Sequence, residues 1–241
     1  MNDRPPMKRV AFVGAGPGAA DLITMRGLRY LQTADCILHD ALVSADLLAL
    51  LPAAAEIIEV GKRCGKPSAV QSTINTQLVT AARRHARVVR LKGGDPMIFG
   101  RTAEEMAALD AAAIDFEIVP GITAALAAAA SLRKSLTLRG VARSVALITP
   151  AVGVDENPHD VTTTSIGADT LAVYMGLNQA RIWAARLLQT GWSDETPVIV
   201  CESISTAHES FDSLSLAGLA GLPEAACRRE GPTLILIGRA L

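Results

Sequence analysis

The sequence predicts an α/β protein made of two domains. Short β-branched and aliphatic runs alternate with amphipathic segments, which is typical of parallel strands joined by crossover helices. Half of the 241 residues are hydrophobic and only 3% are aromatic, so we expect a core of Ala, Leu, Val and Ile. A Pro-Gly pair follows the fifth predicted strand. We place the domain boundary there, which gives domains of residues 1–120 and 121–241.

The first predicted domain alternates strands with helices. The expected strands are 10–13, 36–38, 56–60, 88–91 and 116–119. The expected helices are 24–33, 45–51, 71–84 and 102–112. Thr24 and Ser44 are expected to cap the first two helices. Thr102 and Glu105 fit a capping box at the last, which gives Glu105 a structural role and no chemistry.

The second predicted domain starts with an Ala-rich helix capped by Thr123. The strands expected after it are 145–148, 171–174, 198–201 and 234–237, with a helix over 179–190 that buries Trp183. Residues 150–169 have no clear period. Such a long loop is either functional or disordered, and the sequence leaves both alternatives open.

Composition and charge narrow the class of protein. Lys plus Arg (23) nearly balances Asp plus Glu (24), so no global charge indicates binding to nucleic acid or to a membrane surface. The start lacks a signal-peptide core and no apolar run is long enough to span a membrane, so we expect a cytoplasmic protein. The four cysteines are widely spaced, with no CxxC pair and no His cluster. We therefore expect free thiols and no metal site.

A glycine-rich turn follows the fourth predicted strand, at Gly93-Gly94-Asp95-Pro96. Two glycines let the main chain approach a ligand closely, and Pro96 restricts Asp95 to extended geometry. Open α/β sheets bind ligands at the carboxyl ends of their strands, where this turn is predicted to lie. The alternative is an ordinary strand-to-helix turn capped by an Asp.

Two further loops follow predicted strands. Residues 14–18 form a glycine loop after the first strand, and Asp40 ends the second strand, an order that resembles the start of a dinucleotide-binding fold. The spacing is GxGxG and Pro17 interrupts it, so a nicotinamide or flavin oxidoreductase is the alternative of different chemistry. Residues 61–68 concentrate three cations between glycines. That loop is either solvated or binds a polyanion.

Together these motifs resemble the uroporphyrinogen-III C-methyltransferases of the tetrapyrrole methylase superfamily. The matching segments are 13–18, 38–40, 42–44, 60–63, 88–101, 119–124, 142–145 and 174–179. The resemblance implies two α/β domains with the active site in the interdomain cleft, in a homodimer. It implies that S-adenosyl-L-methionine donates two methyl groups to uroporphyrinogen III, giving precorrin-2 through precorrin-1 for siroheme or cobalamin synthesis. The chain is expected to be a stand-alone methyltransferase.

The resemblance also implies roles for individual residues. Asp40 matches the proton acceptor, although a strand-end cap is the alternative, and Lys62 matches the proton donor, although it could instead bind substrate carboxylates. The implied cofactor contacts are Pro17, Gly93, Gly94, Asp95, Ile98, Thr123, Ala124, Met175, Ile204 and Thr233. Cations suited to the eight substrate carboxylates are Lys62, Arg63, Lys66, Arg101, Arg133, Lys134, Arg139 and Arg143.

The sequence departs from the family pattern on the tetrapyrrole side. Ala41, Leu138, Pro150 and Ala151 stand where the family commonly has Arg, His, Gly and His. The cofactor half is therefore better preserved than the tetrapyrrole half. Three possibilities follow: the usual substrate in a rearranged pocket, a different tetrapyrrole, or weak activity. A non-catalytic binding paralogue is a further alternative.

Overall fold

The chain forms two compact units. The computed structural model describes residues 8–60, 71–150 and 167–241. The N-terminal unit comprises residues 1–123 and the C-terminal unit residues 124–241. The two units meet after Thr123, and the boundary at Pro120 stays a prediction. The Gly121 amide donates a hydrogen bond of 2.9 Å to Asp95 Oδ2, which ties this residue to the N-terminal unit.

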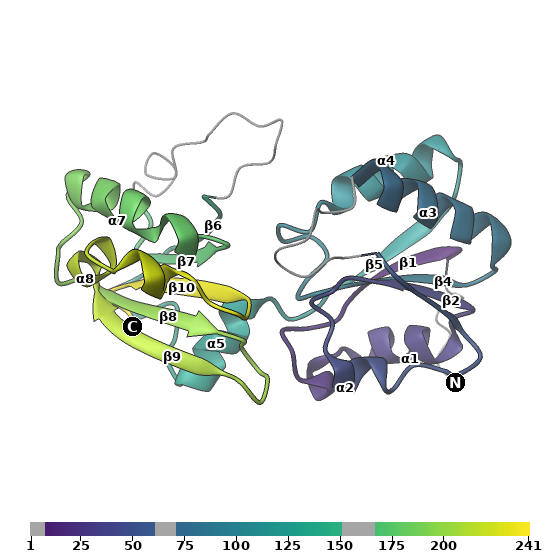
Figure 1. Ribbon diagram of the computed structural model, residues 1–241, viewed down its shortest axis with the longest axis horizontal. Helices are drawn as coiled ribbons and strands as arrows, with labels where there is room; N and C mark the ends of the chain where they lie inside the picture. Colours follow the sequence, from purple (N-terminus) through teal and green to yellow (C-terminus); the bar gives the residue numbers. More distant parts are fainter. Residues whose placement is uncertain (1–7, 61–70, 151–166) are drawn as a thin grey trace. The chain divides into compact units, whose positions relative to one another are not determined.

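The N-terminal unit is a parallel sheet covered on both faces by helices (Figure 1). Its strand order is β3-β2-β4-β1-β5, and every pair in it is parallel. The strands are β1 (Val10–Gly14), β2 (Cys36–His39), β3 (Glu56–Glu59), β4 (Val88–Lys92) and β5 (Phe116–Val119). The helices are α1 (Met25–Thr33), α2 (Ala45–Leu48), α3 (Gln71–Arg84) and α4 (Thr102–Ala111), and a 3-10 turn covers Ala20–Leu22.

The strand order argues against the dinucleotide-binding alternative. In that fold the first two strands are neighbours, so the acid at the end of the second can reach a ribose held by the first glycine loop. Here β4 lies between β1 and β2. The 3-10 turn also separates the glycine loop from α1, so no helix begins at that loop. The geometry required for an NAD site is therefore missing from the described part of this unit.

Each face of the N-terminal sheet has its own core. Ala11, Val13, Ile37, Val89 and Leu91 pack against Leu31 of α1 and Leu47 of α2. Val10, Phe12, Cys36, Leu38 and Val88 pack on the other side, against Leu78 of α3 and Leu109 of α4. Successive strand residues point to opposite faces, and both faces of a parallel sheet are covered. That is why these strands read as continuous apolar runs.

The C-terminal unit is a mixed sheet with the order β6-β7-β10-β8-β9. β6 (Val145–Ile148) runs parallel to β7 (Thr170–Tyr174), whereas β10 (Thr233–Gly238), β8 (Pro197–Glu202) and β9 (Ser210–Ser215) pair antiparallel. Figure 1 shows α7 (Ala180–Gln189) and α8 (Leu216–Ala220) on one face and α5 (Ala124–Leu132) on the other. 3-10 turns cover Leu177–Gln179 and Glu224–Cys227.

Several local predictions are confirmed. The side chains of Thr24 and Ser44 accept hydrogen bonds from the amides of Gly27 and Leu47 and so cap α1 and α2. Trp183 is buried in the C-terminal core. Among the described cysteines, Cys36, Cys201 and Cys227 are buried free thiols, while Cys64 lies outside the described residues. No helix in the described ranges is long and apolar enough to cross a membrane.

Candidate active site

Loops from three strands meet at the carboxyl edge of the N-terminal sheet. Gly16 and Gly94 form a two-residue bridge, in which the Gly16 amide donates to the Gly94 carbonyl (3.2 Å) and the Gly94 amide to the Gly16 carbonyl (2.8 Å). The Ala15 amide donates to the Lys92 carbonyl at 2.7 Å. The glycine loop after β1 is therefore joined to the turn after β4 along the main chain.

Glycine is required where these loops cross. A Cβ on Gly121 would lie 2.2 Å from the Gly94 carbonyl oxygen, and one on Gly14 would lie 2.5 Å from the Gly121 Cα. Gly94 itself has φ of 65°, a region that favours glycine, yet a Cβ there would find no neighbour closer than 3.9 Å. Backbone thus packs on backbone under the turn, and the space beside Gly94 is open for a ligand within this unit.

Asp95 ties these loops together. One carboxylate oxygen, Oδ1, accepts from the Met97 amide at 2.8 Å, and Oδ2 accepts from the Gly121 amide at 2.9 Å. The turn is therefore capped by an Asp, as the structural alternative predicted. Each carboxylate oxygen has a second lone pair, so both remain able to accept a ligand hydrogen bond.

The segment from Pro96 to Thr102 leaves the turn in a strained conformation. Phe99 and Arg101 have φ of 50° and 54°, a left-handed region that costs free energy for residues other than glycine. Ile98, a predicted cofactor contact, is half-buried there. The Thr102 hydroxyl donates to the Pro96 carbonyl, and the Arg101 guanidinium donates to both Glu104 oxygens at 2.7 and 2.8 Å.

Asp40 is held by a buried cluster of charges. It follows β2 and accepts a 2.6 Å hydrogen bond from the Arg90 guanidinium. Arg90 is 1% exposed and also donates to both Glu105 oxygens, at 3.0 and 3.1 Å. The Lys92 ammonium donates to Glu105 Oε1 at 2.9 Å. We call Asp40, Arg90, Lys92 and Glu105 the charge cluster.

The charge cluster compensates its own burial. Burial opposes the charge on Arg90, but Asp40 and Glu105 outweigh that effect and raise the pKa of the guanidinium. Burial, together with the charge of Arg90, lowers the pKa of Lys92, and Glu105 opposes this shift. Asp40 is the member that reaches the surface, with 26% of its side chain exposed. The cluster therefore presents one oriented carboxylate at the sheet edge.

The capping-box prediction for Glu105 was wrong. The residue before α4 is Arg101 in a left-handed conformation, its side chain makes no capping bond, and Thr102 is already the first helical residue. Glu105 points instead into the sheet, where it is 1% exposed between Arg90 and Lys92. Sequence reasoning missed Arg90 altogether. The signal was a pair of cations two residues apart, on one face of a strand that is otherwise apolar.

The remaining predicted cofactor residues lie along one edge of the C-terminal sheet. Met175 follows β7, is 56% exposed and has φ of 53°. Thr233 pairs with Glu202 at the end of β8, and buried Ile204 follows that end. The Ala125 amide donates to the Tyr174 hydroxyl at 3.2 Å, which brings Ala124 and the start of α5 to the same edge. The contact roles of these residues remain predictions.

The other predicted residues lie in loops or outside the described part of the chain. Pro17 and Thr123 lie in the joined loops of the N-terminal unit, half-buried and buried respectively. Arg139 and Arg143 are exposed in the loop between α5 and β6, as are Arg133 and Lys134. Of the departures, Ala41 is half-buried, Leu138 is exposed and Pro150 is buried. The predicted Lys62, Arg63, Lys66 and Ala151, and most of the 150–169 loop, lie outside the described residues.

Comparisons with known proteins agree with these motifs. Residues 9–220 match the family model described as Tetrapyrrole (Corrin/Porphyrin) Methylases. Siroheme synthase 1 of Pectobacterium atrosepticum is 44% identical over 232 residues, which are 96% of this chain and 48% of the relative. A siroheme synthase of Actinobacillus pleuropneumoniae is 42% identical over 241 residues, which are 49% of its length. The chain spans about half the length of these curated relatives.

Solved structures match over nearly the full chain. A uroporphyrin-III C-methyltransferase from Thermus thermophilus, crystallised with S-adenosyl homocysteine, has a TM-score of 0.83 and 35% identity, covering 96% of this chain and 98% of that one. A cobalt precorrin-4 methyltransferase has a TM-score of 0.81 and 30% identity, covering 96% and 95%. The family model covers most of the sequence, and both units contain described segments on which the resemblance rests. The chain therefore belongs to the tetrapyrrole methylase family.

Proposed function

We propose that this protein transfers two methyl groups from S-adenosyl-L-methionine to ring carbons of uroporphyrinogen III, giving precorrin-2 through precorrin-1. The observation that carries the proposal is the likeness, over 96% of this chain, to a Thermus thermophilus uroporphyrin-III C-methyltransferase that was crystallised with S-adenosyl homocysteine. The siroheme synthase names of the relatives support a role in siroheme synthesis. Cobalamin synthesis is the second pathway that the product would serve.

The joined glycine loops fit a methyl donor. S-adenosyl-L-methionine supplies an electrophilic methyl group, and the reaction depends chiefly on holding that methyl in line with the ring carbon. Gly93 and Gly94 expose main-chain groups without Cβ atoms, and the open space beside Gly94 suits a close approach. We assign Pro17, Asp95, Ile98 and Thr123 of this unit to the same site.

Residues of the C-terminal unit complete the proposed cofactor site. These are Ala124, Met175, Ile204 and Thr233, which lie along one edge of their own sheet. Met175 has an exposed, polarizable thioether suited to packing against the adenine or the sulfonium carbon atoms. Placement of the site between the two units, in a homodimer, is part of the proposal.

Asp40 is the proposed general base. Methylation of a pyrrole carbon leaves a cation that becomes neutral when it loses a proton, and a nearby carboxylate can accept that proton. Arg90 donates to Oδ1 of Asp40, which leaves Oδ2 to face the substrate. The charge cluster thus orients the base, and Lys62 is proposed as its partner acid or as a carboxylate ligand.

Exposed cations are proposed to hold the substrate carboxylates. Arg101, Arg139 and Arg143 are exposed in loops, and guanidinium groups pair well with carboxylates. Lys62, Arg63 and Lys66 are assigned to the same role from the sequence. The changes at Ala41 and Leu138 remove two groups expected near the substrate, so we rank the usual substrate in a rearranged pocket above a different tetrapyrrole, and that above weak activity.

The test is methyl transfer with a defined substrate. Protein, S-adenosyl-L-methionine and enzymatically made uroporphyrinogen III are incubated under anaerobic conditions, and product mass is followed by mass spectrometry. We expect a gain of two methyl groups. Asp40→Asn should lower turnover by about 10²-fold or more while S-adenosyl homocysteine binding stays within about twofold. Asp46→Asn, an exposed change on α2, should alter neither.

The competing functions give different results in the same assay. Tight binding of S-adenosyl homocysteine without methylation of any tetrapyrrole would favour the non-catalytic paralogue. Methylation of another tetrapyrrole but not of uroporphyrinogen III would change the proposed substrate but leave the proposed reaction type unchanged. Thermal stabilisation by NADH and none by S-adenosyl homocysteine would overturn the proposal. Equal turnover of Asp40→Asn and wild type would remove Asp40 from the mechanism.

A further inference from the structure

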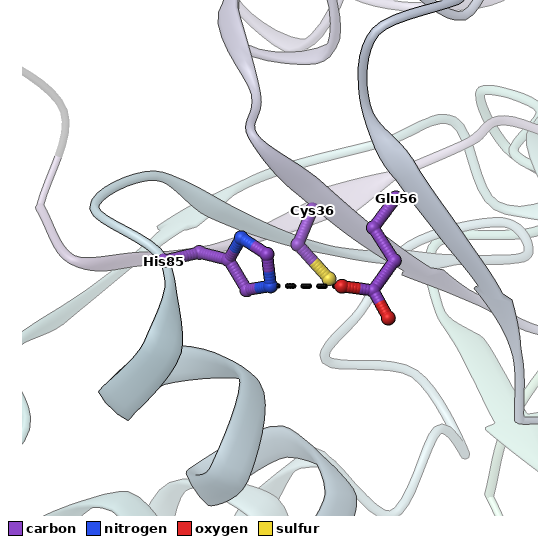
Figure 2. A group of neighbouring side chains, drawn as sticks. All are labelled: Cys36, Glu56 and His85. Atoms are coloured by element: carbon purple, nitrogen blue, oxygen red, sulfur yellow. Dashed lines mark ion pairs between the residues drawn. The ribbon is translucent and has the colours of Figure 1, made fainter.

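Three side chains with metal-binding atoms meet at the amino edge of the N-terminal sheet (Figure 2). Cys36 is the first residue of β2 and Glu56 the first of β3, and the two are direct partners in the parallel register. His85 follows the end of α3, just before β4 begins. Strand pairing and a crossover helix therefore bring together three residues that are far apart in the sequence.

The ligand atoms are close enough to share one ion. The Cys36 sulfur, a His85 ring nitrogen and a Glu56 carboxylate oxygen all lie within 4.8 Å of one another. His85 Nε2 and Glu56 Oε2 are 2.9 Å apart. In tetrahedral zinc sites the ligand atoms are about 3.3–3.6 Å from each other, as bond lengths of about 2.0–2.3 Å require. Small rotations of the partly exposed Glu56 and His85 side chains would bring the three atoms to that geometry.

The Cys36 sulfur belongs to this group, although the residue also packs in the core beneath α3 and α4. Cys36 is a free thiol and is 0% exposed. Figure 2 shows the sulfur pointing to the space between the His85 ring and the Glu56 carboxylate. Cys201, by contrast, is buried and directs its sulfur at the Ile199 carbonyl. The two thiols thus differ in their surroundings.

The group has an opening to solvent. Glu56 and His85 line a surface pocket of about 520 Å³, and its other lining residues are Gln32, Thr33, Ala34, Asp35, Pro52, Ala54 and Arg87. A cation could enter there, and a water molecule could take a fourth coordination position. Entry from this side would leave the core around Cys36 in place.

We propose that the N-terminal unit binds one zinc-class divalent cation through the Cys36 thiolate, the His85 imidazole and the Glu56 carboxylate, with water as a fourth ligand. Sulfur, nitrogen and oxygen donors in this combination suit Zn²⁺ and do not suit Mg²⁺ or Ca²⁺. Binding requires that the thiol release its proton to solvent and that His85 be neutral. The cation takes the place of the direct contact between His85 Nε2 and Glu56 Oε2.

The surrounding charges are mixed. Burial, then Glu56 and Asp35, raise the pKa of Cys36 to about 11, while Arg84 lowers it. Glu56 and Asp35 favour a cation at this position and Arg84 opposes one, whereas Arg87 is already paired with Asp35 at 2.7 Å. A bound metal would replace the proton that the apolar surroundings keep on the thiol.

The site is separate from the proposed methyl-transfer site. Cys36 begins β2 and Asp40 follows the end of the same strand, so the two groups lie at opposite edges of one sheet. A metal at the amino edge would join β2, β3 and the end of α3. Its effect is therefore expected on stability and not on the binding of S-adenosyl homocysteine.

The experiment is a metal titration of the chelator-treated protein. Zn²⁺ is followed by calorimetry, and Co²⁺ by the ultraviolet charge-transfer absorption that a cobalt–thiolate bond produces. We expect one ion per chain, a thiolate signal and a rise in Tm on saturation. Cys36→Ala should abolish the signal, and His85→Gln, a change at the pocket surface, should weaken Zn²⁺ binding by about tenfold or more.

Two controls keep the outcome decisive. Cys227→Ala removes a buried thiol of the C-terminal unit, and Cys64→Ala removes the thiol outside the described residues; both should bind as wild type does. His85→Gln should leave S-adenosyl homocysteine affinity within about twofold of the wild-type value. A signal lost with Cys64→Ala, an absent thiolate band, or wild-type affinity in His85→Gln would overturn the proposal. None of these outcomes bears on methyl transfer.

Discussion

The two faces of the N-terminal sheet are packed alike but differ in charge. Against α1 and α2, β4 buries Val89 and Leu91 among Ala, Val, Leu and Ile residues. Against α3 and α4, the same strand buries Val88, then Arg90 and Lys92, with Glu105 of α4 opposite them. One face is stabilised by apolar burial throughout, whereas the other also encloses charges that must compensate one another.

The difference in charge between the two faces is related to the position of the candidate site. The charge cluster occupies the carboxyl half of β4, next to the turn at Gly93 and Gly94. A Cβ on Gly100 would lie 3.1 Å from Lys92 Cε, so the lysine stem supports the segment after that turn. Arg90 reaches in the other direction and orients Asp40. The charged face thus supports the segment that follows β4 and orients Asp40 after β2, while the apolar face stabilises the sheet beneath them.

The largest effect is expected from Glu105→Gln. The amide keeps the shape of the side chain but removes the negative charge between two buried cations, and breaking such an arrangement costs about 3–5 kcal/mol. The free energy of unfolding, measured with urea, should fall by that amount. Glu104→Gln is the matched control: its pair with Arg101 is exposed, so we expect a loss of about 1 kcal/mol or less.

Equal losses in the two glutamine variants would contradict the compensation argument. The charges beneath β4 would then contribute no more than an exposed ion pair. The two faces of the sheet would differ in composition but not in energetics.

Much of the fold follows from local patterns in the sequence. Residues 71–84 form α3 as predicted, because apolar positions recur there at helical spacing. β9 was not predicted, since its largely polar sequence lies at the sheet edge and none of its residues is buried. α8 was also missed, because it is one short turn that follows β9 directly.

The pairings within the charge cluster and within the Cys36 group could not be predicted from the sequence. Arg90 and Glu105 are 15 positions apart and meet only because α4 crosses over β4. In the sequence, Glu105 fits a capping box, and only its direction in space excludes that role. Cys36, Glu56 and His85 meet through strand register, which no spacing rule reports.

A pair of valines tests whether the faces differ in packing as well as in charge. Val88 and Val89 are adjacent in β4, both are 0% exposed, and they point to opposite faces. Val88→Ala and Val89→Ala each remove two methyl groups, which costs about 2 kcal/mol in burial and cavity. We expect urea unfolding to give losses equal within about 0.5 kcal/mol. A much larger loss for Val88→Ala would show that the charge cluster depends on the packing beside it.

The smallest effect is expected at alkaline pH, on the same charged face. Burial raises the pKa of the Cys36 thiol from 9.0 to about 11, so the folded protein keeps this proton at pH values where the unfolded chain has lost it. The contribution is fully present below pH 9 and is lost as the pH rises through 11. At about pH 10 the loss should be on the order of 1 kcal/mol. The measurement is urea unfolding of wild type and Cys36→Ala at about pH 8 and pH 10, with chelator present. Lys92 and Tyr30 titrate in both proteins, so their effect cancels and the comparison reports on the Cys36 thiol alone. The stability difference between the two proteins should shrink at the higher pH, and a constant difference would mean that the buried thiol ionises as easily as one in water.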